Sequence, residues 1–260
     1  MKAVSIVPTA YLHLITGKPY HLCLAHVALK DPRYYDFYKE VASRGSYVIL
    51  DNGAAEGESV DIQTMEDLAI HLGVSEIVLP DFLYDKQKTL EVAAYALDYI
   101  KTREMFRGKV MAVAQGKTLR ECTLCALHLL TWPVDVIGIP KHLTSLGISA
   151  RVALYWQLRL FSNEPAKEIH FLGCNKLKEI SAMDWQVRSL VRSIDSSIAY
   201  LYARDGYRLD MALVEDIQRS RDPIDFSKVD ADTDADTDID VALVSANITQ
   251  WEVLCSGGLF

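Results

Sequence analysis

Acidic and amide side chains stand at the ends of apolar runs along much of the chain. Asp51, Asp81 and Asp195 each follow such a run, as does Gln115. Carboxylates accept hydrogen bonds and can act as proton carriers or nucleophiles, so a group of them suits a substrate whose head donates hydrogen bonds. The alternative for any single aspartate is that it caps the next helix or starts a turn. The repetition at three positions favours a site.

Lysines follow the same runs within a few residues. They are Lys86, Lys88, Lys117, Lys141, Lys176 and Lys178. Ammonium groups around an acidic centre are what a phosphate-bearing substrate requires, because they contact its phosphate oxygens. Solvated loop lysines remain the alternative.

The charge of the chain does not exclude a nucleic-acid partner. The sequence has 27 basic and 35 acidic residues and a net charge of −8. Six of the acids are the alternate aspartates from Asp230 to Asp240, and without them 29 acidic residues face 27 basic ones. The rest of the chain is therefore close to neutral, which leaves room for a local basic face.

A repeated strand-then-helix order predicts how the polar side chains are positioned. Short runs that are apolar nearly throughout, as in strands buried on both faces, cover 21–29, 47–51, 76–81, 109–115, 135–140, 168–173 and 190–195. Apolar residues three and four positions apart predict helices over 34–42, 64–72, 89–100, 119–130, 151–161 and 177–187. Parallel strands end at a common face, so Gly138 and Gly173 are expected beside the polar strand ends.

This order is typical of an α/β fold, and we predict a (β/α)8 TIM barrel rather than a doubly wound open sheet. The chain has 260 residues, close to the about 250 that are typical of that barrel. The eighth strand is expected to be irregular, with Met1–Pro8 and Val241–Ser245 competing for it. The barrel is assigned to residues 1–225, an acidic flexible linker to 226–240, and a C-terminal segment that docks on the barrel to 241–260.

The cysteines and the N-terminus indicate a reducing compartment. Five scattered cysteines suit free thiols better than a disulfide framework. The one ligand-like cluster, Cys122, Cys125 and His128, lies on a single predicted helix and leaves a tetrahedral zinc site incomplete, so neither a metal nor a cofactor is expected. The N-terminus lacks a signal-peptide pattern and no apolar run reaches the about 18 residues of a membrane span, so we expect a cytoplasmic protein with no membrane partner.

Six strand-end segments resemble, in the same order, motifs of the tRNA-guanine transglycosylase family. Asp-Asn-Gly at 51–53 is similar to the family's Asp-Ser-Gly-Gly, and Val-Ala-Gln-Gly at 113–116 is similar to its Val-Gln-Gly. The other segments are 79–85, 137–140, 170–174 and 193–197, so the resemblance spans more than half of the chain. It implies a barrel enzyme that exchanges guanine in a polynucleotide for a 7-deazaguanine base such as queuine.

The resemblance also implies a role for each polar strand end. Asp195 would be the nucleophile that forms a covalent glycosyl-enzyme intermediate, and Asp51 the general acid/base. Asp81 would accept from N1–H and the N2 amino group of guanine, and Gln115 would donate to O6 or to the substituent at position seven. The target nucleotide would leave its stack to enter the pocket. The pocket would be completed by backbone groups of Gly138 and Ile139 and by packing from Leu172 and Gly173.

The sequence departs from the family pattern around the base. Ala55 lies where the family tends to supply an aromatic ring, so stacking would come from Phe82 or Tyr84. Ala54 replaces the second glycine, and Phe82 stands where the family often has glutamate, which leaves the identity of the deazaguanine open. The zinc ligands of the tRNA-acting members have no counterpart after Asp195. The chain is therefore more similar to the short phage-associated branch, which places 7-deazaguanines in DNA.

The expected partners are thus a polynucleotide, with DNA slightly preferred over tRNA, and a free 7-deazaguanine base. Two other functions stay open: a hydrolase that releases the base to water, and a catalytically silent binder of nucleobases or nucleic acid. A homodimer or a partner subunit also stays open, for which Tyr155 and Trp156 on the helix over 151–161 could supply an interface. Barrel packing explains those two side chains equally well.

Overall fold

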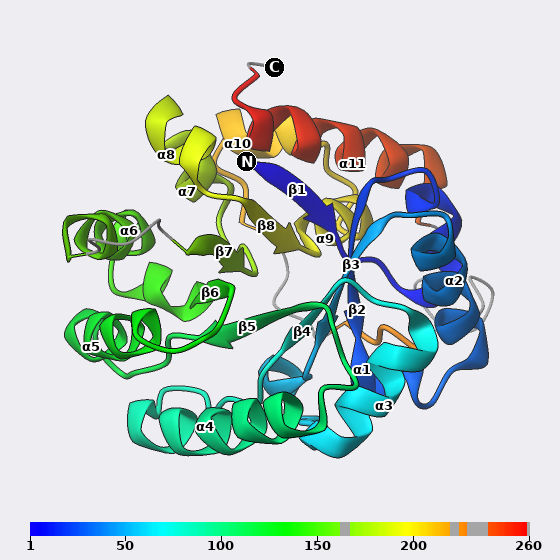
Figure 1. Cartoon of the computed structure of the whole chain (residues 1–260). Coiled ribbons are helices and arrows are strands. Elements are labelled where there is room, and N and C mark those ends of the chain that lie inside the picture. The colour runs from blue at the N-terminus through cyan, green and yellow to red at the C-terminus, as the bar shows by residue number, and fades with distance from the viewer. Residues whose placement is uncertain (162–166, 219–223, 228–238, 259–260) are drawn as a thin grey trace.

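Eight parallel strands form one nearly closed, barrel-shaped sheet with helices around it (Figure 1). The structure, a computed structural model, describes residues 1–161, 167–218, 224–227 and 239–258. Consecutive strands from β2 to β8 are neighbours, and β8 also pairs with β1. The predicted (β/α)8 barrel is confirmed. Its strands are β1 (Lys2–Ser5), β2 (Tyr20–Leu24), β3 (Tyr47–Asp51), β4 (Glu76–Val78), β5 (Lys109–Val113), β6 (Val136–Pro140), β7 (Glu168–Leu172) and β8 (Ser193–Ser196).

The N-terminal strand β1 is the eighth strand that the sequence left open. It pairs in parallel with β8 and places Val4 beside Asp195. Between β1 and β2 the described residues form no strand ladder, although the two strands are in contact. Lys2 bridges this seam, because its Nζ donates to the Tyr20 hydroxyl and lies 4.1 Å from the centroid of the Tyr20 ring. The competing segment, Val241–Ser245, belongs to a helix.

The helices lie outside the sheet and follow the predicted order. The helix predicted over 119–130 has these same bounds, since Thr118 caps it by accepting from the Glu121 N–H. Short 3-10 turns cover Thr9–Ile15, Ala54–Glu56 and Lys141–Ser145. The α-helices are α1 (Ala25–Ala28), α2 (Pro32–Ser43), α3 (Ile62–Leu72), α4 (Lys86–Arg103), α5 (Leu119–Leu130), α6 (Ala150–Phe161), α7 (Leu177–Ser181), α8 (Trp185–Leu190), α9 (Ile198–Arg204), α10 (Leu209–Val214) and α11 (Val241–Ser256).

Three predicted elements differ most from the observed ones, and the bounds of the others shift by at most three residues. The strand predicted over 21–29 ends at Leu24 and continues as α1, and the helix predicted over 177–187 is split into α7 and α8. The split lies at Asp184, whose side chain accepts from the Val187 N–H and so starts a new helix. The strand predicted over 76–81 is the shorter β4, which ends at Val78 before Pro80, a residue with no N–H to donate.

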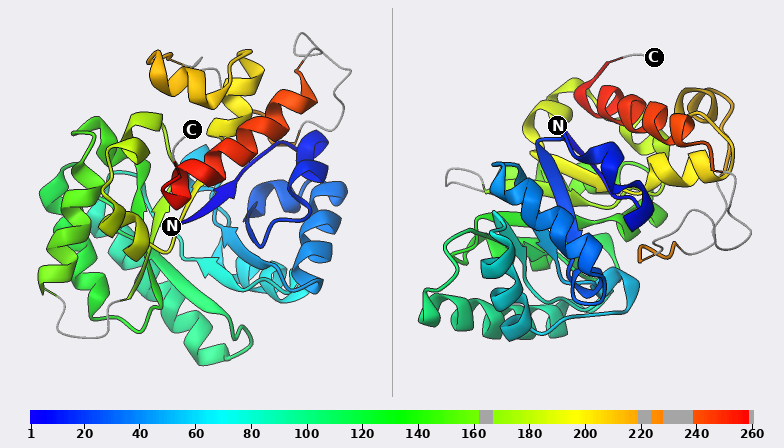
Figure 2. Two further views of the ribbon diagram at one scale, coloured as in Figure 1. Left: turned by 90° about the horizontal axis from the view of Figure 1, so that it is seen from above. Right: turned by 90° about the vertical axis from the view of Figure 1, so that its right-hand side faces the viewer.

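Helix α11 packs along the barrel beside β1 and α9 (Figure 2). Its Trp251 is completely buried. Asn247 ties the helix to its neighbours, because its Oδ1 accepts from the Leu209 N–H and its Nδ2 donates to the carbonyls of Ala199 and Tyr207. The helix thus covers the N-terminal strand. Of the linker predicted over 226–240, residues 228–238 lie outside the described residues.

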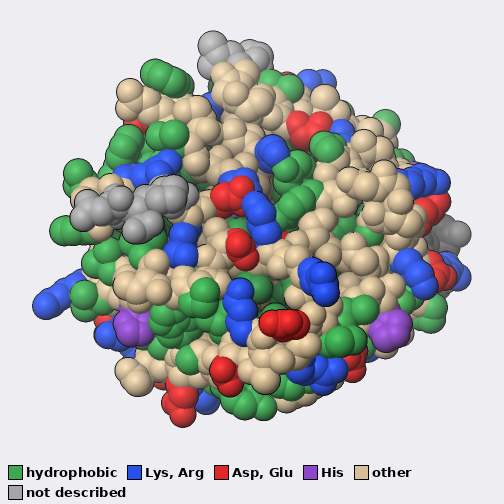
Figure 3. Space-filling model, in the orientation of Figure 1, with side chains coloured by type: hydrophobic (Ala, Val, Ile, Leu, Met, Phe, Trp, Pro, Cys, Tyr) green, Lys and Arg blue, Asp and Glu red, His purple; other side chains and the backbone are tan. Residues whose placement is uncertain are grey.

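The surface carries charges of both signs and some exposed apolar side chains. Basic and acidic side chains are interspersed over the face shown in Figure 3. No helix in the described part of the chain is both long and apolar enough to cross a membrane. Of the two side chains considered for an interface, Tyr155 is completely buried and Trp156 is partly exposed. Packing within the fold therefore accounts for Tyr155.

Candidate active site

A cavity of about 200 Å³ lies at the carboxyl ends of the strands. It is smaller than the about 300–1,000 Å³ of pockets for drug-sized ligands, and it suits a ligand of one or two rings. Its lining includes all four polar strand ends, Asp51, Asp81, Gln115 and Asp195, together with Leu172 and Gly173. Polar lining residues to which the sequence assigned no role are Asn52, Glu56, His142, Asn175, Ser196 and Ser197.

Asp195, on β8, is held through one of its two carboxylate oxygens. Its Oδ1 accepts from the Gly173 N–H at 2.9 Å, and His170 Nε2 lies 2.9 Å from the same oxygen. Its Oδ2 accepts no hydrogen bond from the described residues, although the side chain is almost completely buried. The carboxylate is therefore fixed in orientation with one oxygen left for a ligand.

Asp51 ends β3 in a turn that requires glycine. Its Oδ2 accepts from the Gly53 N–H at 3.1 Å. Gly53 has a left-handed backbone with φ 78°, and a Cβ there would lie 2.7 Å from His26 Nδ1. Burial, and then the negative charge of Glu56, raises the pKa of Asp51 well above its usual range, and Asp195 adds to this shift. Asp51 is therefore suited to hold a proton, as a general acid must.

Replacing Asp51 with asparagine is expected to stabilise the fold at neutral and higher pH. A carboxyl whose pKa is raised on folding contributes stability that is present below its unfolded pKa of about 4 and lost as the pH rises through the raised value. At pH 8 the variant should melt higher, by about 2–4 °C for each kcal/mol gained, whereas below pH 4 the two proteins should melt alike. Thermal unfolding followed by circular dichroism measures both, and a lower melting temperature for D51N at pH 8 would contradict the argument.

Asp81 is held by two side-chain amides. Asn52 Nδ2 donates to its Oδ1 at 2.8 Å, and Gln115 Nε2 donates to its Oδ2 at 2.6 Å. Burial raises the pKa of Asp81, and these two hydrogen bonds oppose that shift because they favour the charged form. A carboxylate oxygen can accept more than one hydrogen bond, so both oxygens keep capacity for the donors of a ligand.

The site aspartates do not cap helices. Helix α3 is capped by Asp61 and α4 by Asp85, each through a side-chain oxygen that accepts from a backbone N–H. Helix α9, which follows β8, has Ser197 at its N-cap and no side-chain cap bond. Capping is therefore wrong for all three site aspartates, whereas Asp51 does start a turn, because its Oδ2 accepts from the Gly53 N–H.

Gly138 and Ile139 are absent from the described residues that line the cavity, contrary to the prediction. Both are buried inside β6, which extends to Pro140, so Pro140 and Lys141 form this part of the wall. Gly138 serves packing instead, because a Cβ there would lie 2.8 Å from Leu172 Cδ1.

A buried ion pair that sequence reasoning missed supports the same wall. Arg151 and Glu179 are both completely buried and are joined by two hydrogen bonds of 2.6 and 2.5 Å. Arg151 Nη1 also donates to the carbonyls of Leu172 and Gly173, at 3.2 and 2.8 Å, and to that of Ile139 at 3.4 Å. The guanidinium thus ties the ends of β6 and β7 together.

Tyr84, one of the two candidates for stacking, lines the cavity, and Phe82 is not among its described lining residues. Tyr84 has a left-handed backbone with φ 64°, which is uncommon for a residue other than glycine. Its N–H donates to Gln115 Oε1 at 3.2 Å, and its ring meets the His142 ring edge-on with centroids 4.7 Å apart. Such strained residues cluster at functional sites.

Most of the predicted lysines are not among the described residues that line the cavity. Lys141 lines it, and there it opposes the burial that raises the pKa of Glu56. Lys178 is paired with Asp216 at 2.6 Å, and Lys88 Nζ lies 3.6 Å from the centroid of the Phe82 ring. At the cavity itself, Lys141 is the lysine that lines the described wall.

The cysteine cluster on α5 is part of the core. Cys122 and Cys125 are buried, and Cys122 Sγ lies 3.4 Å from the Gly116 carbonyl oxygen. His142 Nε2 lies 3.9 Å from Cys122 Sγ, whereas the His128 ring packs against Trp132. Among the described residues no group of three or more His, Cys, Asp or Glu side chains is arranged to hold a metal ion.

Comparison with known proteins adds no family assignment to the residues of this site. Of the predicted site residues, Asp51, Asp81, Gln115, Asp195, Leu172 and Gly173 lie together. Neither a scan of protein-family models nor a search of curated proteins found a match to the chain.

Proposed function

We propose that this protein is a guanine transglycosylase, which exchanges guanine in a polynucleotide for a 7-deazaguanine base through a covalent intermediate on Asp195. One observation carries the proposal: the four polar strand ends that match the family's motifs, far apart in the sequence, line a single small cavity. The preference for DNA over tRNA rests on the similarity to the short branch of that family.

Asp195 and Asp51 have different roles in the proposed exchange. Asp195 Oδ2 attacks C1′ of the target nucleotide, the bond from C1′ to guanine breaks, and its electron pair leaves with the base. Asp51 carries a raised pKa and supplies the proton that neutralises the departing guanine. In the second half, Asp51 takes the proton of the incoming base as its nitrogen attacks C1′ and releases Asp195.

Asp81 is proposed to read the base. Guanine presents two adjacent donors, N1–H and the N2 amino group, and an ionised carboxylate offers two adjacent acceptors. Asn52 and Gln115 leave both oxygens of Asp81 with capacity to accept, as described above. Tyr84 at the rim supplies an aromatic surface beside the base.

The proposal is tested by incubating the protein with labelled guanine or 7-cyano-7-deazaguanine, in parallel with duplex DNA and with bulk tRNA. Each polymer is then digested to nucleosides, and mass spectrometry detects the incorporated labelled base. Label in one polymer identifies both reaction and substrate. Free base with an abasic product and no incorporation would instead support a hydrolase, and base binding without any turnover would support a silent binder.

Substituting alanine for Gly173 is expected to cost activity beyond its cost in stability. Gly173 has φ 68°, and an L-residue there loses about 1–2 kcal/mol, while the new Cβ would lie 2.5 Å from Lys141 Cδ. The resulting shift would displace the N–H that holds Asp195.

Gly206→Ala is the matched control for this variant, because Gly206 has φ 81° with nothing within 4 Å of the added Cβ. Thermal melts should show a loss of stability in both variants, with the larger loss in G173A because its added Cβ also meets Lys141 Cδ. The exchange assay should show a loss of about tenfold or more only for G173A. Equal activity of the two variants would contradict the role given to the Gly173 N–H.

A further inference from the structure

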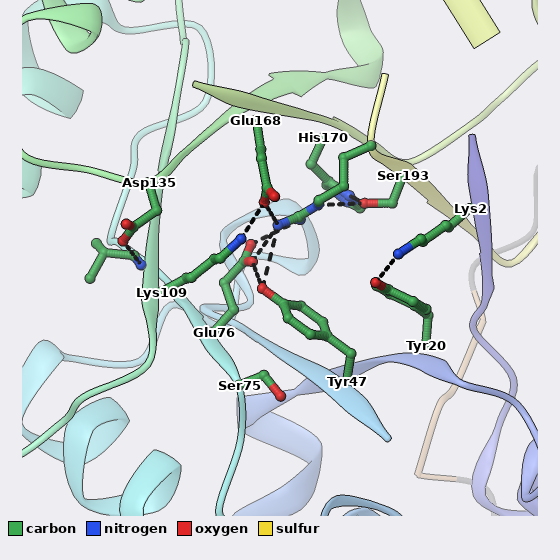
Figure 4. Close-up of polar contacts among 12 residues, drawn as sticks. Lys2, Tyr20, Tyr47, Ser75, Glu76, Lys109, Asp135, Glu168, His170 and Ser193 are labelled. Carbon is green, nitrogen blue, oxygen red and sulfur yellow. Dashed lines mark hydrogen bonds and ion pairs between the residues drawn. The ribbon is translucent and has the colours of Figure 1, made fainter. Parts of the chain in front are cut away.

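A cluster of charged side chains fills the inside of the barrel at the opposite end from the cavity. Figure 4 shows Tyr47, Glu76, Lys109 and Glu168 gathered there. Glu76 is completely buried and receives two bonds from the Arg192 guanidinium, at 2.5 and 3.1 Å, and one from the Tyr47 hydroxyl at 2.5 Å. Glu168 Oε2 accepts hydrogen bonds from Arg192 Nη1 at 3.1 Å and from Lys109 Nζ at 2.7 Å. Arg192 is therefore fixed in one orientation by charge-assisted bonds.

A chain of three hydrogen bonds leads from this cluster to the candidate nucleophile. Arg192 Nε donates to Ser193 Oγ at 3.0 Å, Ser193 Oγ lies 2.8 Å from His170 Nδ1, and His170 Nε2 lies 2.9 Å from Asp195 Oδ1. His170 and Ser193 are completely buried, so water does not compete for these contacts. None of the roles proposed above uses the contacts from Arg192 to Ser193 and from Ser193 to His170.

The donors and acceptors in this chain limit where the protons can lie. Arginine has no acceptor, so the Ser193 oxygen must accept from Arg192, and its own hydrogen remains free to point at His170 Nδ1. Nδ1 then accepts, and the single ring proton of a neutral imidazole lies on Nε2, facing the Asp195 carboxylate. The opposite tautomer would place a nitrogen lone pair against Oδ1.

We infer that His170 is a positioning residue for Asp195: the Arg192–Ser193 pair fixes its neutral tautomer with the proton on Nε2, which occupies Oδ1 and leaves Oδ2 to attack. The tautomer is argued from these contacts and does not depend on the proposed function. The consequence for attack rests on the proposed function, and the two are tested separately.

The tautomer is read by two-bond 1H–15N correlation spectra of the 15N-labelled protein, without any substrate. The His170 pattern is identified by its loss in His170→Gln and, should that variant not fold, by its shift in Ser193→Ala. We expect a neutral ring protonated on Nε2, and a mixture of tautomers in S193A. A ring protonated on Nδ1, or on both nitrogens, at neutral pH would overturn the inference.

The positioning role is read by kinetics in the exchange assay. Ser193→Ala should lower kcat by about 10–100-fold, by analogy with the loss on removing a group that orients a metal ligand, with KM for the free base unchanged. Ser193→Thr, which keeps the hydroxyl, should restore much of the loss, and Ser189→Ala on the exposed side of α8 is the matched control. Unchanged kcat in S193A would overturn the role. Absence of exchange in the unaltered protein would refute the proposed function and leave the spectral result to decide the tautomer.

Discussion

Asp195→Asn is expected to abolish base exchange, with a loss of at least about 10⁴-fold in kcat, since removing an enzymatic nucleophile can cost about 10⁶. Asparagine has nearly the same shape, and its Oδ1 can still accept from the Gly173 N–H and from His170 Nε2. The atom that replaces Oδ2 is an amide nitrogen, which cannot form the glycosyl bond. The fold and the cavity should therefore persist while the covalent step is lost.

Mass spectrometry of the protein after quenching with substrate DNA and no incoming base should detect a covalent adduct in the unaltered protein and none in D195N. Thermal unfolding of D195N confirms that the fold is intact. Asp36→Asn, on the exposed face of α2, serves as the matched control and should exchange at the normal rate. Exchange by D195N at the unaltered rate would remove Asp195 from the chemistry.

The strand ends could be predicted because two simple signals coincide there. The predicted strands are short apolar runs, and four of those runs stop at Asp or Gln. Parallel strands then bring those residues to one face whatever the detailed helix bounds are. An error in the predicted end of a strand does not change this result. Strand β4 ends at Val78, three residues before Asp81, and Asp81 still lines the cavity.

Contacts between distant strands could not be predicted in the same way. His170 precedes Leu172 by two residues and therefore shares its inward face, so the pattern of β7 does place a polar ring inside the barrel. Nothing in the local sequence indicates that Ser193 and Asp195 would meet it from β8. Gly138 shows the reverse error, since its place in a matching motif suggested a ligand contact where packing against Leu172 is the constraint.

The two ends of the barrel therefore differ in how their charges are balanced. The amino end of the sheet is closed by the paired charges of Glu76, Arg192, Glu168 and Lys109, which satisfy one another. At the carboxyl end, three aspartates share a cavity with Lys141 as the nearby cation of the described lining. Burial raises the pKa of Asp51, and the negative charges of Glu56, Asp195 and Asp81 add to that shift. The same crowding that destabilises the ionised site thus prepares one of its members to carry a proton.

Asp81→Asn is expected to remove the preference for guanine and to weaken its binding by about 10²–10⁴-fold, because each charge-assisted hydrogen bond contributes about 1.5–3 kcal/mol. The substitution keeps the size of the side chain but replaces one acceptor oxygen with an amide donor. That donor would face either Asn52 Nδ2 or Gln115 Nε2, both of which donate to Asp81. Gln115 cannot turn its oxygen inward without losing the bond from the Tyr84 N–H.

Calorimetry with the free bases measures this effect without turnover, and hypoxanthine supplies the matched ligand because it lacks only the N2 amino group of guanine. The unaltered protein should bind guanine more tightly than hypoxanthine, since hypoxanthine leaves one oxygen of Asp81 without its donor. In D81N the two bases should bind with similar, weak affinity, whereas Asp98→Asn on the exposed side of α4 should leave both affinities unchanged. Retained discrimination in D81N would mean that another lining group reads the amino edge, and Asp81 would then serve only to hold Asn52 and Gln115 in place.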